Sequence, residues 1–267
     1  MAAPDVFSSS APKVADSPSS GEAKLPRSMK PGLVSSYVAS MRSALASRKR
    51  IEAPSLGRIV MPVAIALFVV LVVAVLIAPA GDIDFQFREE EGIVTTLSAI
   101  FLAMASGFAG ACYLTEGKPG HGLKLWWLLT CLGFFFFACD ELLRFHEQVG
   151  TFVRHHLLGR PTMFFRNWND VIVILYGVVA LVVIAYFLPR ILRLPLYMEL
   201  LAVAFFAYCV HTGVDVMPHG DGIIGRFMSS IPSSIPEEGA KLYASTFFAV
   251  AMLNALRIVT RNPNAPA

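Results

Sequence analysis

The stretch from residue 59 to residue 78, IVMPVAIALFVVLVVAVLIA, decides the fold class, because its twenty residues include no charged side chain. About 20 apolar residues in a helix are enough to cross the roughly 30 Å of hydrocarbon in a bilayer. A strand of a membrane barrel would alternate apolar and polar residues, and this stretch does not alternate. The stretch therefore predicts a membrane-spanning helix, whose backbone satisfies its own hydrogen bonds in lipid.

Five more apolar stretches follow along the chain. Of the 267 residues, 55% are hydrophobic and 15% are charged, a balance that excludes a soluble domain. We predict an all-α polytopic membrane protein with six transmembrane helices and a disordered N-terminal tail. The expected spans are Ile59–Ala78, Gly92–Leu114, Leu123–Cys139, Val171–Leu188, Leu196–Val210 and Leu242–Leu256.

The region before the first span divides into two parts. Residues 1–31 are rich in Ser, Pro, Ala and Lys, which is typical of a disordered tail. Residues 32–54 carry apolar side chains at helical spacing among basic ones, which predicts a basic amphipathic juxtamembrane helix. This helix is expected either to lie on the inner leaflet or to dock on the protein itself. Residues 55–267 form the predicted six-helix transmembrane domain.

Basic residues indicate the orientation of the spans. Arg48, Lys49 and Arg50 precede the first span, and Arg190 and Arg193 follow the fourth. Positive charge favours the cytoplasmic side, so we expect a multi-pass protein of the inner membrane with both termini in the cytoplasm. Trp126 and Trp127 are expected in the aromatic belt of the inner interface. The sequence has no basic stripe interleaved with aromatic residues, so nucleic acid is not an expected partner.

Polar side chains flank alternate ends of successive spans, so the threaded chain brings them to one face of the membrane. A charged group at the hydrocarbon edge is costly, which makes such a cluster a candidate functional site. Ordinary helix-start chemistry accounts for part of the pattern, because carboxylates favour the first turn of a helix. That explanation covers Glu89–Glu91, Asp170 and Glu237–Glu238, each of which opens a predicted span.

The third span ends in the sequence DELLRFHE, residues 140–147, where helix-start chemistry does not apply. On one continuous helix, Asp140, Arg144 and Glu147 would share a face at spacings i, i+4 and i+7. Carboxylates at a helix C-terminus oppose its dipole, so no capping role is expected for Asp140 or Glu141. Either Arg144 pairs with Asp140 and Glu147 where the helix emerges into water, or Asp140 and Glu141 point into a polar pocket between helices.

His211, Asp215 and His219 follow at one-turn spacing and would form a ladder on an unbroken helix. Imidazole and carboxylate groups at this spacing can share a metal ion. We expect His146, His211 and Asp215 as ligands of a divalent metal, zinc or iron, with Asp140, Glu141 and Glu238 as catalytic carboxylates. The same groups would also suit a proton relay, because histidine titrates near neutrality.

Four arginines surround the loop after the third span and give it a possible lipid partner. Arg144, Arg154, Arg160 and Arg166 could bind the headgroup of an anionic lipid. Membrane lipids are the expected partners, and the sequence does not identify a protein partner. The four cysteines form no C-x-x-C pair, which argues against a zinc ribbon or a thioredoxin-like motif.

The pairs Asp140-Glu141 and His146-Glu147, together with Glu237-Glu238, resemble a pattern in an uncharacterised family of bacterial multi-pass membrane proteins with a DE-x4-HE motif. The resemblance implies a shared polar cluster and brings no activity with it. The chain is more loosely similar to intramembrane metal hydrolases of the alkaline ceramidase type, which also place Asp and His at helix ends. Those enzymes have seven spans and a Ser/His/Asp arrangement that has no match in this chain.

Three functions fit the sequence. The first is a metal-dependent membrane enzyme that acts on a lipid-like substrate, which needs the site residues to converge. The second is a non-catalytic membrane partner in a larger complex. The third is a proton- or ion-linked transporter, which needs a polar path across the bilayer, and the inner halves of the spans carry few charges.

Overall fold

The computed structural model describes residues 32–48, 55–78, 86–87, 92–116, 123–158, 168–216 and 234–261. Their elements are helices, and no strand occurs among them, which confirms the all-α prediction. The helices are α1 (Leu33–Arg48), α2 (Leu56–Ile77), α4 (Ile93–Thr115), α5 (Lys124–Leu143), α6 (Phe145–Val153), the π-helical turn η1 (Arg154–Leu158), α7 (Trp168–Ile191), α8 (Tyr197–Val216) and α10 (Ser234–Arg261). The predicted tail, residues 1–31, lies outside the described residues.

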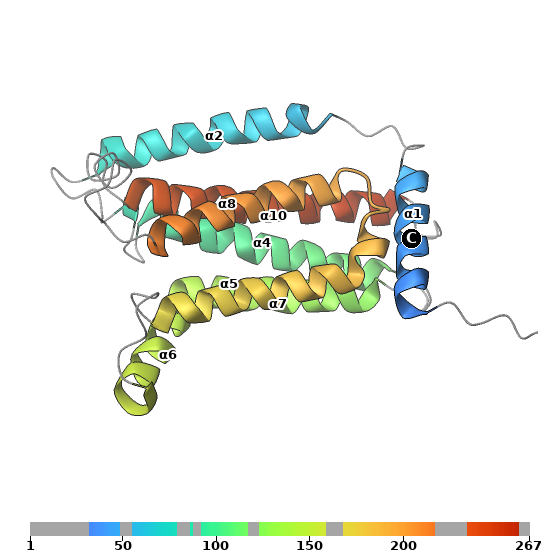
Figure 1. Cartoon of the computed structure of the whole chain (residues 1–267). Coiled ribbons are helices and arrows are strands. Elements are labelled where there is room, and N and C mark those ends of the chain that lie inside the picture. The colour runs from blue at the N-terminus through green and yellow to red at the C-terminus, as the bar shows by residue number, and fades with distance from the viewer. Residues whose placement is uncertain are drawn as a thin grey trace, which may run out of the picture.

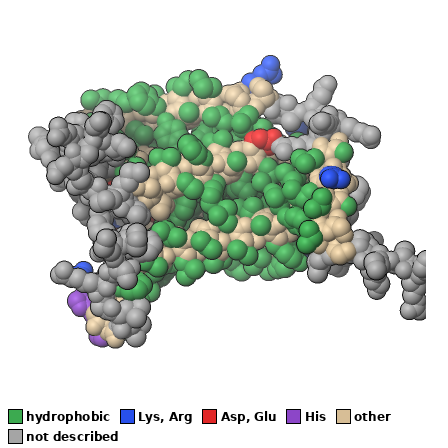
Figure 2. Space-filling model, in the orientation of Figure 1, with side chains coloured by type: hydrophobic (Ala, Val, Ile, Leu, Met, Phe, Trp, Pro, Cys, Tyr) green, Lys and Arg blue, Asp and Glu red, His purple; other side chains and the backbone are tan. Residues whose placement is uncertain are grey.

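Six of these helices, α2, α4, α5, α7, α8 and α10, are long and apolar enough to cross a membrane. They run side by side, as Figure 1 shows; α1 lies across one end of the bundle, and α6 projects away from the opposite end. Hydrophobic side chains cover the middle of the face in Figure 2. The chain is therefore a multi-pass membrane protein. We call the end where α5 finishes and α10 begins the acidic end, and the other the basic end.

Five of the six helices lie within a few residues of the predicted spans, and α10 differs most. Its expected span began at Leu242, whereas the helix begins at Ser234. The extra turns contain Glu237, Glu238 and Lys241, which the hydropathy pattern excluded. The helix can bury part of this polar turn because the positive charge of Lys241 compensates the negative charge of Glu238 on the same helix.

Helix α10 is the centre of the bundle. It packs along both α4 and α8, and α4 packs along α5. Half of the span window of α10 is buried inside the protein, compared with 11% for α2 and 6% for α7. α2 and α7 therefore turn most of their apolar side chains towards the surroundings, as lipid-facing helices do.

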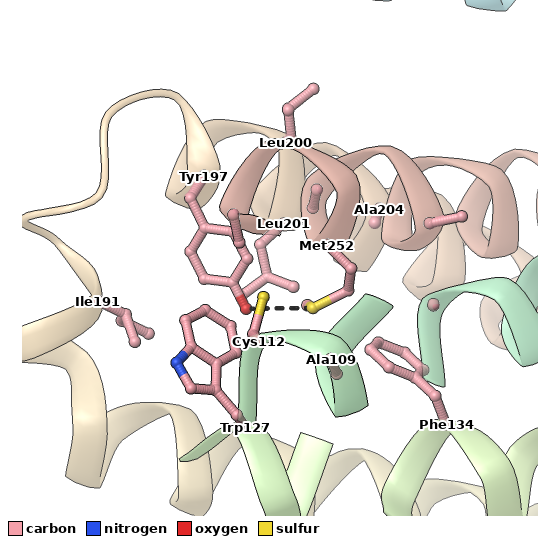
Figure 3. Close-up of a cluster of buried hydrophobic side chains, with 14 of the residues drawn as sticks. Ala109, Cys112, Trp127, Phe134, Ile191, Tyr197, Leu200, Leu201, Ala204 and Met252 are labelled. Atoms are coloured by element: carbon pink, nitrogen blue, oxygen red, sulfur yellow. Dashed lines mark hydrogen bonds between the residues drawn. The ribbon is translucent and has the colours of Figure 1, made fainter. Parts of the chain in front are cut away.

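A cluster of buried aromatic and aliphatic side chains fills the basic end (Figure 3). Tyr197 is fully buried, and its hydroxyl donates to the sulfur of Met252 at 3.7 Å. The Trp127 ring packs edge-on against Tyr197 with centroids 5.9 Å apart. Trp126 and Trp127 are only 4% and 0% exposed, so the prediction that they lie in an interfacial belt is wrong. Both rings pack inside the aromatic cluster instead.

Helix α1 lies across the basic end of the bundle (Figure 1). The Tyr37 hydroxyl donates to the carbonyl oxygen of Ala185 on α7 at 2.8 Å, and Ala44 is fully buried. Val34 and Leu45, in contrast, remain 77% and 46% exposed. The helix thus docks on the protein along one side and leaves apolar side chains for a second surface on the other.

The chain breaks sharply between α5 and α6. Arg144 adopts the left-handed conformation, with φ 50° and ψ 44°, which ends α5 and redirects the next helix. α6 then leaves the bundle sideways (Figure 1). The helix passes close to the start of α7, where a Cβ added at Gly150 would lie 2.8 Å from the backbone nitrogen of Asn169.

Candidate functional site

Asp140, at the end of α5, binds the first turn of α6 through both oxygens of its carboxylate. Oδ1 accepts a hydrogen bond from the backbone N–H of His146 at 2.9 Å, and Oδ2 lies 2.8 Å from Nδ1 of the same residue. The first bond satisfies an N–H in the first turn of α6, where a carboxylate also favours the dipole. The expectation that Asp140 has no capping role is therefore wrong, because it caps the helix that follows its own.

The end of α5 at Arg144 also means that Asp140, Arg144 and Glu147 do not share one helical face. The spacing i, i+4, i+7 requires one continuous helix, and the left-handed Arg144 interrupts it. Glu147 falls in the first turn of α6, with an oxygen 3.9 Å from the guanidinium of Arg144. The shared helical face is thus a wrong prediction, although Arg144 and Glu147 do form an ion pair.

His146 lies outside the spans, in α6, with its side chain 25% exposed. Burial alone would lower its pKa, but the hydrogen bond and charge of Asp140, aided by Glu147 and Glu141, raise the pKa above the ordinary value of 6.5. Within the described part of the chain, no hydrogen bond reaches the other ring nitrogen, Nε2. The imidazole is therefore held through Nδ1 by the carboxylate of Asp140.

Glu141, Lys241 and Glu238 form a second cluster, the carboxylate–lysine triad. Nζ of Lys241 lies 2.6 Å from Oε1 of Glu141 on α5 and also forms an ion pair with Glu238 one turn away on α10. The side chains of Glu141, Lys241 and Glu238 are 13%, 19% and 8% exposed, so the triad is largely shielded from water. One ammonium group shared by two carboxylates gives the triad a formal charge of −1.

Sequence reasoning placed Glu141 and Glu238 in the site but overlooked Lys241. The signal was present, because Glu238 and Lys241 stand at spacing i, i+3 and must share a helix face once α10 is extended back to Ser234. The helix boundary, taken too late in the sequence, hid this relation. The ammonium group of Lys241 is the cation that lies between the carboxylates of Glu141 and Glu238.

The Asp140–His146 pair and the triad are neighbours. Glu141 acts electrostatically on His146, as the direct sequence neighbour of Asp140. Asp140 also lies within electrostatic range of Tyr176 on α7 and Tyr208 on α8. Side chains of four spans and of α6 therefore meet at the acidic end, as the threading of the sequence predicted.

His211 joins this end of the bundle from α8. Its Nδ1 lies 3.0 Å from the carbonyl oxygen of Glu237, at the start of α10. The His211 ring lies 6.1 Å from the ring of Tyr208. Asp215 belongs to α8, but its side chain lies outside the described residues, as does the whole of His219 beyond the helix.

Two of the expected metal ligands, His146 and His211, each have one ring nitrogen held by an oxygen atom. Metal-binding histidines usually anchor one ring nitrogen on a carboxylate or a carbonyl, as His146 and His211 both do through Nδ1. No group of three or more His, Cys, Asp or Glu side chains with metal-binding geometry occurs among the described residues. A site with His146, His211 and Asp215 remains a prediction that depends on Asp215.

Other residues of the expected acidic face fall outside the described part of the chain. These are Arg88, Glu89, Glu90, Glu91, Arg160 and Arg166, together with the side chain of Asp170. Of the four arginines predicted to bind a lipid headgroup, Arg144 and Arg154 are described, and Arg154 is exposed on η1. Lipid binding by this set therefore stays a prediction.

Comparison with known proteins places the chain in a family. No curated protein and no solved structure matches it. A family model described as a domain of unknown function (DUF8692) matches residues 63–256, well over half of the chain. The matched region begins in α2 and ends in α10, and so contains the Asp140–His146 pair and the carboxylate–lysine triad. The chain belongs to the DUF8692 family.

Proposed function

We propose that this protein is an integral membrane enzyme that acts on the polar end of a lipid-like substrate, with His146 as its proton acceptor. The observation that supports the proposal is the double contact of Asp140, which fixes both the backbone and Nδ1 of His146. A histidine oriented by a carboxylate at one nitrogen acts as a general base through the other. Asp140 raises the pKa of His146 above its ordinary value of 6.5, which makes the imidazole a stronger proton acceptor.

The location of His146 fits a substrate that resides in the bilayer. The residue lies three positions beyond the end of α5 and two after the left-handed Arg144, so it stands at the end of a span. The polar part of a lipid would lie at this level, while its chains would contact the exposed apolar side chains of the neighbouring spans. We place the acidic end on the extracytoplasmic side of the inner membrane, because basic residues gather at the other end.

In this proposal the triad positions the site and takes no part in the reaction. Lys241 holds Glu141, the neighbour of Asp140, against α10. This contact fixes the end of α5 and therefore the carboxylate that orients His146. A metal ion bound by His146, His211 and Asp215 would give the same location a different chemistry, in which His146 binds the metal through Nε2.

Turnover of lipids by the reconstituted protein tests the proposal. Nanodiscs with wild-type protein are incubated with a total lipid extract, and products are followed by mass spectrometry. We expect His146→Gln to lower the rate about 100-fold or more, the usual loss for a general base. Thr151→Ala, an exposed change on the same helix, should keep the wild-type rate.

Asp140→Asn tests the positioning role of Asp140 separately. The amide can still accept the bond from the backbone of His146, but the negative charge that raises the pKa of His146 is lost. The acid limb of the rate–pH profile should therefore move to lower pH. Full turnover by folded His146→Gln protein at every pH would exclude His146 as the base.

A non-catalytic role as a membrane partner is the second candidate, and the loose packing of α2 favours it. Only Leu67 and Ala74 of its 22 residues are buried, and Phe68 is 62% exposed. Photo-crosslinking from position 68 in native membranes would give one protein adduct of constant mass if a partner covers α2. Lipid adducts alone would contradict this role. A transporter is less favoured, because the aromatic cluster fills the basic end between the helices.

A further inference from the structure

We propose that α6 and η1 form a second functional surface, which binds the interface of a bilayer that contains anionic phospholipids. This surface does not depend on the proposed reaction of His146. α6 begins directly after a membrane span ends, and it turns away from the bundle instead of continuing along the direction of α5 (Figure 1). A helix in that position lies near the boundary between hydrocarbon and headgroups.

One side of α6 is apolar and exposed. Phe145, Val149 and Phe152 are 37%, 47% and 54% exposed. Their spacing of i, i+4 and i+7 places them in a single stripe along the helix. Such a stripe gains stability when it leaves water, and in a membrane protein the nearest apolar phase is the upper part of the acyl chains.

The other contacts of α6 fix the direction of this stripe. The helix is held to α5 by the two bonds of Asp140 with His146, and by Gln148, whose Nε2 donates to the carbonyl oxygen of Leu143 at 2.8 Å. Gly150 is buried against Asn169 at the start of α7. The helix cannot rotate its apolar side into the bundle without breaking these contacts, so the stripe faces the surroundings.

Cationic and titratable side chains follow the stripe directly. Arg154, His155 and His156 are exposed on η1, and the His156 ring lies 4.9 Å from the Phe152 ring. Figure 2 shows histidine side chains at this corner of the molecule. An apolar stripe that ends in such groups matches an interface with acyl chains below and anionic phosphates above.

Charge complementarity selects anionic lipids as the occupant. From Arg144 to Leu158, the part of this region that the structure describes, there are two arginines and one acidic residue, Glu147, so the formal charge is 2 − 1 = +1 with neutral histidines. A cationic side chain near an anionic leaflet adds roughly fivefold to its binding. A zwitterionic bilayer would receive the apolar stripe but would gain nothing from these charges.

Hydrogen–deuterium exchange of the whole protein in nanodiscs tests the surface. Discs of phosphatidylcholine are compared with discs that also contain phosphatidylglycerol, and exchange is followed in residues 145–156. We expect this segment to exchange about fivefold more slowly in the anionic discs. The variant Arg154→Gln/His155→Gln/His156→Gln should remove the difference, whereas Arg257→Gln/Arg261→Gln, exposed at the other end of α10, should keep it.

The apolar stripe has its own variant. Val149→Ser/Phe152→Ser should speed exchange of the segment in both kinds of disc, while α4 and α10 keep their wild-type protection and so report an intact fold. Equal exchange of wild-type protein in the two kinds of disc would overturn the choice of anionic lipid. Protection that the serine variant leaves unchanged would exclude insertion of the stripe. Slow exchange found only in native membranes would indicate a protein occupant and would also overturn the proposal.

Discussion

Lys241 Nζ lies 2.6 Å from Glu141 Oε1, and this contact joins α10 to α5 at the acidic end. The two helices also touch in the core, where the ring centroids of Phe134 and Phe248 lie 5.0 Å apart, and α4 packs along both of them. The ion pair makes a further direct link across the bundle. Glu238 shares the same ammonium group, so three charges depend on one another.

Removal of Lys241 should destabilise the protein strongly. Lys241→Met leaves Glu141 and Glu238 close together and without their shared cation, and breaking a buried ion pair in this way costs about 3–5 kcal/mol. Thermal melts in detergent measure the loss. The triple variant Glu141→Gln/Lys241→Met/Glu238→Gln removes all three charges and should recover most of the stability.

Lys124→Met is the matched control for Lys241→Met. Lys124 lies over the Tyr113 ring at 5.0 Å from its centroid, a contact worth about 0.5–1 kcal/mol at a partly exposed site. Its loss should lower the melting temperature far less. Similar melts for Lys124→Met and Lys241→Met would show that the triad does not contribute as an ion-pair cluster.

The Asp140–His146 pair should make stability depend on pH. The folded state raises the pKa of His146, so its contribution is fully present below the ordinary value of 6.5 and is lost as the pH rises through the raised value. Melts of wild type and His146→Gln between about pH 5.5 and 8.5 should therefore converge as the pH rises. Asp140→Asn should flatten the wild-type dependence, and a difference that grows towards high pH would contradict the assignment.

Gly150 should tolerate no side chain. A Cβ at this position would meet the backbone of Asn169, which cannot move away as a flexible side chain can, so Gly150→Ala should cost about 1–3 kcal/mol. At Gly107 and Gly133 nothing lies within 4 Å of an added Cβ. Alanine there should be neutral or stabilising by about 0.5–1 kcal/mol. A harmless Gly150→Ala change would mean that α6 does not pack against α7 in solution.

Much of the fold could be predicted from the sequence, because uninterrupted apolar stretches and their lengths leave few alternatives in a bilayer. The boundary of α10 could not, since its first turns are polar and depend on partners from α5. The break at Arg144 was also hidden. Left-handed residues are usually glycine or asparagine, and an arginine gives no such signal.

The candidate site was predictable in location but not in its pairings. Threading alone brings Asp140, Glu141, His146, His211 and Glu238 to one end. Which groups contact each other depends on helix rotation and on the direction of α6, neither of which is encoded in local spacing. Trp126 and Trp127 show the same limit, since a position near a span end does not reveal whether a ring faces lipid or the core.

Metal analysis distinguishes the two chemistries considered for His146. As a base, His146 needs no metal, so a chelator should leave both turnover and the melt unchanged. If His146, His211 and Asp215 bind zinc or iron, purified protein should contain the metal and His211→Ala should lack it. Metal that is retained by wild type and lost from folded His211→Ala would replace the general-base proposal with a metal site.

Cysteine labelling tests the orientation. With the four native cysteines replaced, a cysteine at Ser233 should react with an impermeant reagent from outside, and one at Asn262 only after the membrane is opened. The basic residues Arg190 and Arg193 at the end of α7 motivate this orientation. The reverse labelling would move the acidic end, and the proposed site with it, to the cytoplasm.

The central place of α10 has a consequence for biogenesis. α10 follows the other five spans along the chain, yet it packs along α4 and α8 and carries the lysine that neutralises Glu141. Until α10 enters the bilayer, α5 carries an unmatched carboxylate at its end, α8 lacks its main neighbour, and α4 lacks one of its two. A ribosome stalled before α10 would therefore leave an incomplete bundle, in which the charge of Glu141 has no partner from α10.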